Sequence, residues 1–207
     1  HIKSRPIPYD YQLKAGASSG IQNYPNEYFI TTVAHEIGHQ FGAGHTHSST
    51  TGSCGSNYST TDSWEIAGGS SIMSYTFACA PLVYTTSSYH YFNAGSIRRM
   101  QSRMAESICN NAGFTTTSPT NLNAPLITNT ISNYVIPINT PFKLKIDAID
   151  NDGDALTYVF DQHNATTTGM SAYPTGTEVT GPLFKHLLPQ TSNERRFPSL
   201  ANLANGN

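Results

Sequence analysis

The chain has 207 residues, which is enough for one medium-sized domain or two small ones with a buried core. Its net charge is −2 and only 12% of its residues are charged, so it has neither the basic field of a nucleic-acid-binding protein nor an acidic block. No apolar run approaches the roughly 18–20 residues that a membrane span needs.

The first predicted element is a helix over residues 26–42. Asn26, which follows Pro25, is suited to the N-cap, and Gly42 stands where a residue with positive φ would end the helix. Apolar residues recur at three- and four-residue steps and predict a buried stripe, formed by Phe29, Ile30, Val33, Ala34, Ile37 and Phe41.

Residues 46–71 are rich in Ser, Thr, Gly and Asn, which predicts an irregular loop anchored by Trp64 and Ile66. A second helix is predicted over residues 94–110, with stop signals at residues 111–113. Its apolar stripe consists of Ile97, Met100, Met104 and Ile108.

Residues 113–125 are rich in Thr, Ser, Pro and Asn, and we interpret them as a linker. Beyond it the apolar period becomes two over residues 142–148, "DNDGD" at 150–154 would turn the chain, and "ALTYVF" at 155–160 would return as the second strand of a hairpin. We therefore predict an α+β chain with two domains, residues 1–112 and 126–207. The second is expected to be a small all-β sandwich module with an incomplete or disordered end.

The "DNDGD" stretch, Asp150 to Asp154, also resembles calcium loops. The EF-hand pattern does not fit, because it needs glycine at its sixth position and glutamate at its twelfth. An aspartate-glycine hairpin turn explains the stretch fully. The hairpin also resembles those of Ig-like and cadherin-like modules appended to secreted bacterial enzymes, a few of which bind calcium between modules, so a Ca²⁺ ion is the alternative.

The strongest chemical signal is "HEIGHQFGAGH" at residues 35–45. His35 and His39 are four residues apart on one helix face, so their imidazoles can converge on one zinc ion. Gly42 allows a sharp turn that brings His45 back to the same ion. Three neutral imidazoles leave the fourth tetrahedral position open for water, which is typical of a catalytic zinc site.

Glu36 follows the first of these histidines and could reach a metal-bound water from the side. Zinc lowers the pKa of such a water towards about 7, and Glu36 would accept its proton during attack on a carbonyl and pass it to the leaving amine. The alternative is a helix whose histidines coincide by chance. Five fixed positions make such a match on the order of one in ten thousand.

HExxHxxGxxH resembles the zinc signature of the metzincin peptidases, which adds a methionine turn under the metal. Here "SSIMSY" would supply that turn with Met73, for which an ordinary core methionine is the alternative. The chain is most similar to reprolysin-like (adamalysin-related) secreted peptidases of bacteria over about residues 11–110. Only 34 residues precede His35, so the resemblance implies a partial catalytic domain: zinc helix, Met-turn and C-terminal helix. We expect a processed form or a fragment that lacks most of the substrate-aligning edge strand and need not be active by itself.

Two residues near the motif bear on this resemblance. Thr46 stands where many animal relatives have an aspartate beneath the site. Tyr75 matches the "SxMxY" turns of astacin-like and serralysin-like members, in which the tyrosine can ligate zinc and stabilise the oxyanion. An ordinary buried or rim tyrosine is the alternative role for Tyr75.

The three cysteines leave at least one thiol without a partner in this chain. The resemblance implies that Cys54 pairs with Cys79. It also implies that Cys109 pairs with a cysteine upstream of this chain, and a free buried thiol is the alternative.

The remaining histidines are not expected to bind the metal. We predict that His47 is a solvated surface residue and that His90 is a packed or rim residue. The others, His1, His163 and His186, have no companions at ligand spacing.

These observations predict a secreted or cell-surface-associated zinc endopeptidase that acts on protein or peptide substrates. A truncated peptidase relic that binds protein or polysaccharide through its β module is the alternative, and the intact Glu36 argues against it. A zinc hydrolase of non-peptide substrates is a third, weaker reading.

Overall fold

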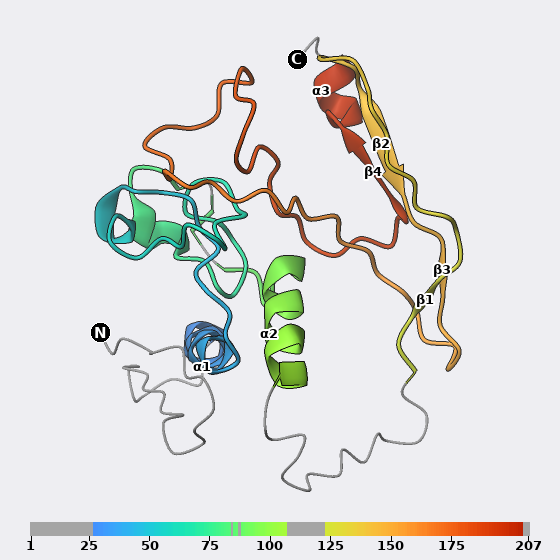
Figure 1. The fold of residues 1–207 in the computed structure, drawn as a ribbon, viewed down its shortest axis with the longest axis horizontal. Helices are drawn as coiled ribbons and strands as arrows, with labels where there is room; N and C mark the ends of the chain where they lie inside the picture. Colours follow the sequence, from blue (N-terminus) through green and yellow to red (C-terminus); the bar gives the residue numbers. More distant parts are fainter. Residues whose placement is uncertain (1–26, 84, 87, 107–122, 205–207) are drawn as a thin grey trace, which may run out of the picture. The chain divides into compact units, whose positions relative to one another are not determined.

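The computed structural model describes residues 27–83, 85–86, 88–106 and 123–204. Helices and short strands both occur, so the chain is of mixed α and β structure (Figure 1). Its contacts divide it into two units, of which the first comprises residues 1–114 and 161–186 and the second residues 115–160 and 187–207. No helix among the described residues is long and apolar enough to cross a membrane.

Helix α1, Glu27–Gln40, confirms the first predicted helix, while its expected cap Asn26 lies outside the described residues. Gly42 has a φ of +89°, as expected for a left-handed C-terminal residue. The Gly42 amide donates to His39 O at 3.0 Å, and the Ala43 amide donates to Gly38 O at 3.0 Å. This pair of bonds is a Schellman motif, which turns the chain sharply just before His45.

The predicted buried stripe of α1 is wrong at Ile37 and Phe41, whose side chains are 49% and 37% exposed. The face that packs inward carries His35 and Gly38 instead, both of which are buried. Ile37 lies two residues after His35, which is about 200° around a helix, so it must point away when His35 points in.

Residues 43–83 form a compact coil with two 3-10 turns, η2 (Gly52–Cys54) and η3 (Thr76–Cys79). A disulfide joins Cys54 to Cys79, with their Cα atoms 5.1 Å apart. Trp64 and Ile66 are buried, as predicted for the anchors of this loop. The rest of the interior consists largely of small polar side chains without exposed area, namely Thr46, Ser48, Ser49, Ser63, Ser70 and Ser71.

Helix α2, Ala94–Glu106, confirms the second predicted helix. The last residues of that prediction, 107–110, include Cys109 and lie outside the described residues. Its predicted stripe is wrong at Ile97 and Met104, which are exposed. The buried face carries Ser96 and Gly95 instead. A Cβ at Gly95 would overlap the ring of Trp64, so α2 turns its smallest side chains toward the core to let the indole approach.

The second unit holds two short antiparallel sheets. Strand β1 (Leu126–Ile127) pairs with β3 (Ala148–Ile149), and β2 (Phe142–Lys145) pairs with β4 (Glu194–Phe197). The short helix α3, Leu200–Ala204, follows β4. The rings of Phe142 and Phe197 stack at 4.8 Å between centroids, which fixes the register of β2 on β4.

The predicted hairpin is wrong in its second strand. A turn does form at Asp150, whose carbonyl accepts from the Gly153 amide at 3.3 Å and whose carboxylate accepts from the Asp152 and Asp154 amides. Residues 155–160 do not pair back on β2. Tyr158 forms its bridge with Gln190, and β2 takes a partner about fifty residues later in the chain. An alternating pattern identifies a strand face but does not name its partner.

Residues 161–186 group with the first unit by their contacts, and the bounds predicted for the second domain stay a prediction. Within the described residues the strands make two two-stranded sheets, and the sandwich stays a prediction.

Candidate metal centre

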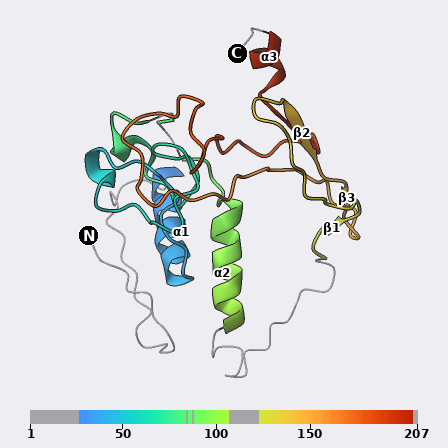
Figure 2. The same cartoon turned by 45° about the horizontal axis from the view of Figure 1, so that its top comes forward.

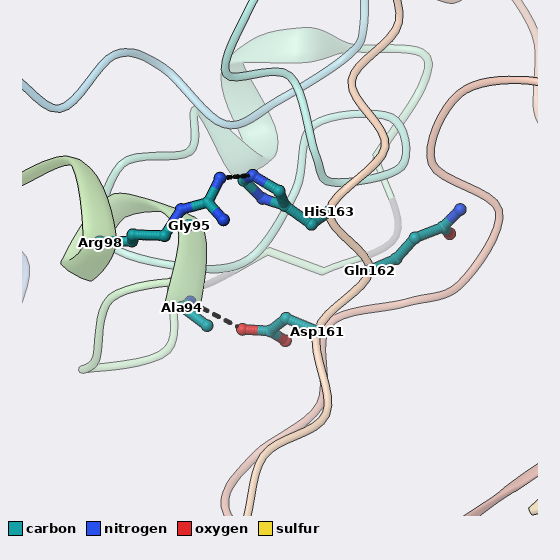
Figure 3. Close-up of a pocket in the computed structure, with 6 residues that line it drawn as sticks. All are labelled: Ala94, Gly95, Arg98, Asp161, Gln162 and His163. Atoms are coloured by element: carbon teal, nitrogen blue, oxygen red, sulfur yellow. Dashed lines mark hydrogen bonds between the residues drawn. The ribbon is translucent and has the colours of Figure 1, made fainter. Parts of the chain in front are cut away.

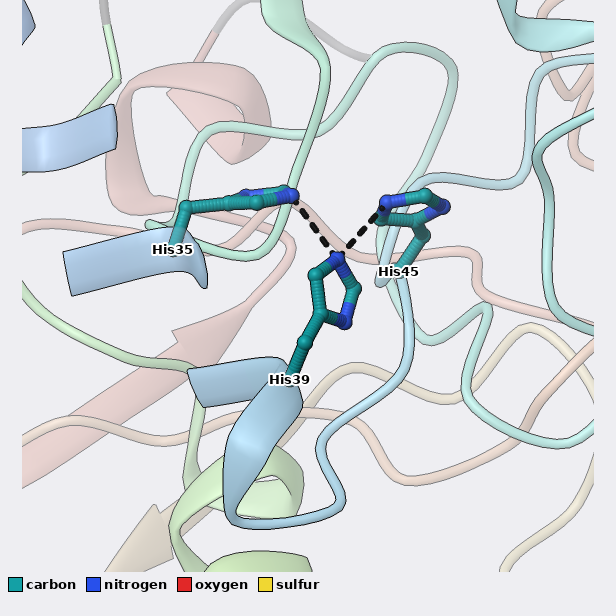
Figure 4. A group of neighbouring side chains, drawn as sticks. All are labelled: His35, His39 and His45. Carbon is teal, nitrogen blue, oxygen red and sulfur yellow. Dashed lines mark hydrogen bonds between the residues drawn. The ribbon is translucent and has the colours of Figure 1, made fainter. Parts of the chain in front are cut away.

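Three histidine side chains converge where α1 ends. His35 and His39 project from the same face of α1, and the turn at Gly42 returns His45 to them (Figure 4). His39 Nε2 lies 3.0 Å from His35 Nε2 and 3.1 Å from His45 Nε2. The sequence predicted this grouping from spacing alone, and the structure brings all three nitrogens within 4.8 Å of one another.

Each of the three rings is oriented from behind by a backbone carbonyl. His35 Nδ1 donates to Ile72 O at 2.7 Å, His39 Nδ1 to Ala43 O at 2.8 Å, and His45 Nδ1 to Asn57 O at 2.5 Å. A carbonyl can only accept, so each Nδ1 carries the proton. In a neutral imidazole the Nε2 atom then presents a lone pair, and all three lone pairs face one point.

Burial keeps two of these rings neutral. It lowers the pKa of His35 to about 4 and, although the hydrogen bond that His45 Nδ1 donates to Asn57 O acts in the opposite direction, that of His45 to about 3. Imidazole nitrogens whose lone pairs face one another repel unless a cation lies between them. Zn–N bonds of 2.0–2.1 Å in a tetrahedron place the nitrogens about 3.3–3.4 Å apart, close to the distances of 3.0 and 3.1 Å found here. The donor set therefore fits a zinc ion.

The turn at residues 71–74 packs against the histidine motif. Met73 has no exposed area and packs with Ala43 and Ile72. A Cβ at Gly38 would lie 2.5 Å from Met73 Sδ, so the glycine of α1 admits this close approach. The Met73 carbonyl accepts from the Thr46 amide at 3.0 Å, next to His45. Through these contacts the turn holds both ends of the histidine motif.

Tyr75 lies beside the three histidines. Its ring centroid is 4.4 Å from that of His45 and 5.8 Å from that of His35. Burial raises the pKa of Tyr75, and the negative charge of Glu36 raises it further. Tyr75 therefore keeps its hydroxyl proton at neutral pH, within the electrostatic reach of Glu36.

The prediction that His47 is a solvated surface residue is wrong, because its side chain has no exposed area. A parallel bridge to Glu65 draws this part of the loop inward, and the ring lies 4.9 Å from that of Tyr75. Burial lowers the pKa of His47 to about 3. His47 also lies close to Cys54 and Cys79, but those sulfurs are joined in a disulfide and are not thiolates that could bind a metal.

The other described histidines lie away from the triad's nitrogens. His90 is exposed. His186 is buried and its Nδ1 lies 2.5 Å from Asp161 Oδ1, while His163 contacts Arg98 and packs on the Trp64 ring at 4.6 Å.

Glu65 is a buried residue near the histidine motif that the sequence did not predict to be part of the site. Its carboxylate accepts from the amides of Ser70 and Ser71 at 2.7 and 3.1 Å and from both serine hydroxyls. Its own amide donates to Thr46 O at 2.9 Å, and Thr46 Oγ1 lies 3.2 Å from Ser71 Oγ. The available signal was that Glu65 and Asp62 are the acids of a stretch that is otherwise rich in Ser, Thr and Gly.

Residues 8–105, just under half of the chain, match the family model described as Metallo-peptidase family M12B, reprolysin-like. Neither the curated proteins nor the solved structures that were compared include a match to the chain. The matched residues include the whole histidine motif and Met73, and the match supports a reprolysin-like metallopeptidase domain in this part of the chain.

Proposed function

We propose that the protein is a secreted zinc endopeptidase that hydrolyses peptide bonds in protein substrates. His35, His39 and His45 would hold the ion through their Nε2 atoms. When bound, zinc acts as a Lewis acid on a carbonyl oxygen and makes water a better nucleophile at neutral pH. The observation that carries the proposal is the orientation of the three rings, each with Nδ1 bonded to a carbonyl and Nε2 free to coordinate.

Glu36 is the proposed general base. It follows the first ligand on α1, is partly exposed, and lies close enough to Tyr75 for its charge to raise the tyrosine's pKa. It would take a proton from the attacking water and deliver that proton to the leaving amine. Tyr75, which stays protonated at neutral pH, would donate a hydrogen bond to the oxyanion as negative charge develops there.

Secretion is part of the same proposal. The Cys54–Cys79 disulfide supports it, since disulfides persist in oxidising compartments and are rare in the cytosol. The low proportion of charged residues also supports it, as a compositional correlation.

The test is Glu36→Gln in the full chain, with Glu178→Gln as a control at an acid away from the triad. The glutamine keeps size and hydrogen bonding but cannot accept a proton. We expect unchanged zinc content and a loss of casein cleavage of at least about a hundredfold, at the lower end of what a positioned acid–base group contributes. Unchanged cleavage by Glu36→Gln would refute the assignment of the base.

A further inference from the structure

A segment far along the chain packs on the loop that orients His45. Residues 163–173 belong to the first unit, although the family match ends at residue 105. In Figures 1 and 2 this segment, drawn in orange, runs beside the loops drawn in teal and green. Met170 forms a parallel bridge with Ser49.

The contacts reach both ends of the loop and its middle. At one end, the Thr50 amide donates to Met170 O at 2.8 Å and the Met170 amide donates to Ser48 O at 2.7 Å. At the other end, Ser63 Oγ donates to Thr166 O at 2.8 Å. In the middle, the Tyr58 hydroxyl donates to Thr167 O at 3.2 Å.

Tyr58 is the neighbour of Asn57, whose carbonyl accepts the hydrogen bond from His45 Nδ1. On one side of Asn57 the loop holds itself, because the Asn57 amide donates to Cys54 O at 3.0 Å and the disulfide to Cys79 anchors Cys54. On the other side, residues 58–63 contain no helix or strand, and the bonds of Tyr58 and Ser63 to the segment hold the chain that follows the Asn57 carbonyl. The position of that carbonyl therefore depends in part on the segment.

The start of the segment is itself held on the first unit. Asp161 Oδ2 accepts from the Ala94 amide at the beginning of α2 at 2.9 Å, and His163 contacts Arg98 (Figure 3). The opposite oxygen of Asp161 pairs with His186, and both side chains are buried. The segment is thus fixed to α2 before it reaches the loop.

We propose that residues 163–173 are a positioning element of the metal centre, which holds the 48–63 loop so that Asn57 O orients His45. This proposal rests on the proposed zinc function only in that metal affinity is one of the quantities measured to test it. The contacts between the segment and the loop are present without the ion. A metal-binding unit cut at the end of the family match would lack this element.

Gly169 offers a specific way to displace the segment. Its φ is +71°, and an added Cβ would overlap Thr50 Cγ2. Gly176 is the matched control, because its φ is +93° and nothing lies within 4 Å of an added Cβ. Both alanine variants carry the same kind of backbone strain, but only Gly169→Ala pushes against the loop. Thr50→Ser removes the overlapping methyl group and keeps the hydroxyl that donates to Met170 O.

The experiment measures Co²⁺ affinity and the visible Co²⁺ spectrum of the full chain, together with amide hydrogen exchange of residues 48–63 without metal. Changing an outer partner of a metal ligand weakens metal binding by about 10–100-fold, and Gly169 acts one step further away. We expect Gly169→Ala to bind Co²⁺ about tenfold more weakly than Gly176→Ala, with faster exchange in the loop. The double variant Gly169→Ala with Thr50→Ser should recover most of the affinity.

Equal affinities and equal exchange in the two alanine variants would overturn the proposal, and so would a loss that Thr50→Ser does not restore. Should Gly169→Ala not fold, Ser63→Ala decides by the same criteria, since it removes one bond to Thr166 O. A parent chain that binds no Co²⁺ would count against the zinc function alone, and the exchange comparison would still decide the role of the segment.

Discussion

Replacing Glu65 with alanine should destabilise the loop at residues 70–74, which contacts His35 of the metal centre through Ile72 O. The carboxylate has no exposed area and accepts from two buried amides, Ser70 N and Ser71 N, as well as from two hydroxyls. Water cannot replace a buried acceptor of this kind, so the amides would lose their partner altogether. Hydrogen bonds to a charged group contribute about 1.5–3 kcal/mol each, so the loss of two amide bonds costs about 3–6 kcal/mol.

A loss of that size is a large fraction of the roughly 5–15 kcal/mol by which domains are stable. Glu65→Gln should cost less, about 1–2 kcal/mol, because its amide oxygen still accepts from both N–H groups while its NH₂ group replaces the oxygen facing Ser71. Urea unfolding of the metal-free chain measures both changes.

Glu178→Ala is the matched control. The Glu178 carboxylate also accepts from two amides, Thr175 N and Gly176 N, but at the surface, where water takes its place. We expect that variant to unfold almost as the parent does. If Glu65→Ala stays within about 1 kcal/mol of the parent, the buried carboxylate does not stabilise the turn and the reasoning is refuted.

Three further outcomes follow from the same contacts. Replacing Cys54 and Cys79 together with serine should lower the free energy of unfolding by about 3 kcal/mol, since the bond closes a loop of 25 residues; an unchanged urea midpoint would contradict this. The metal-free chain should lose stability as the pH falls from about 6.5 towards 4. The pKa values of His35 and His45 in the folded chain, about 4 and 3, lie below the value in the unfolded chain, so the unfolded chain binds more protons over this range. Urea unfolding at several pH values would show this loss, and a free energy of unfolding that does not change with pH would exclude it. Finally, His47→Phe should retain Co²⁺ binding while His45→Phe loses it, and a His47→Phe chain without bound Co²⁺ would place His47 among the ligands.

The sequence could predict what local geometry determines. Helix spacing places His35 and His39 on one face, and Gly42 needs a positive φ to bring the chain back, so both statements depend on only eleven residues. The end of α1 before Gly42 and the start of α2 at Ala94 could be predicted for the same reason, because the signals that begin and end a helix are local.

Features that depend on distant partners could not be predicted in this way. The buried face of α2 is selected by the close approach of Trp64 to Gly95, which no apolar count reveals. His47 is buried because its strand-like segment bridges Glu65, and β2 pairs with a strand about fifty residues away. In the packing of residues 163–173 on the 48–63 loop, the segment contributes mainly backbone groups, which leave little trace in its pattern of side chains.

X-ray absorption at the zinc edge of the purified full chain is the most direct test of the metal centre. We predict one zinc ion per chain, with only nitrogen and oxygen neighbours at about 2.0–2.1 Å and the outer-shell scattering of three imidazoles. Sulfur neighbours at about 2.3 Å, or a chain that retains no zinc after dialysis into metal-free buffer, would contradict the account.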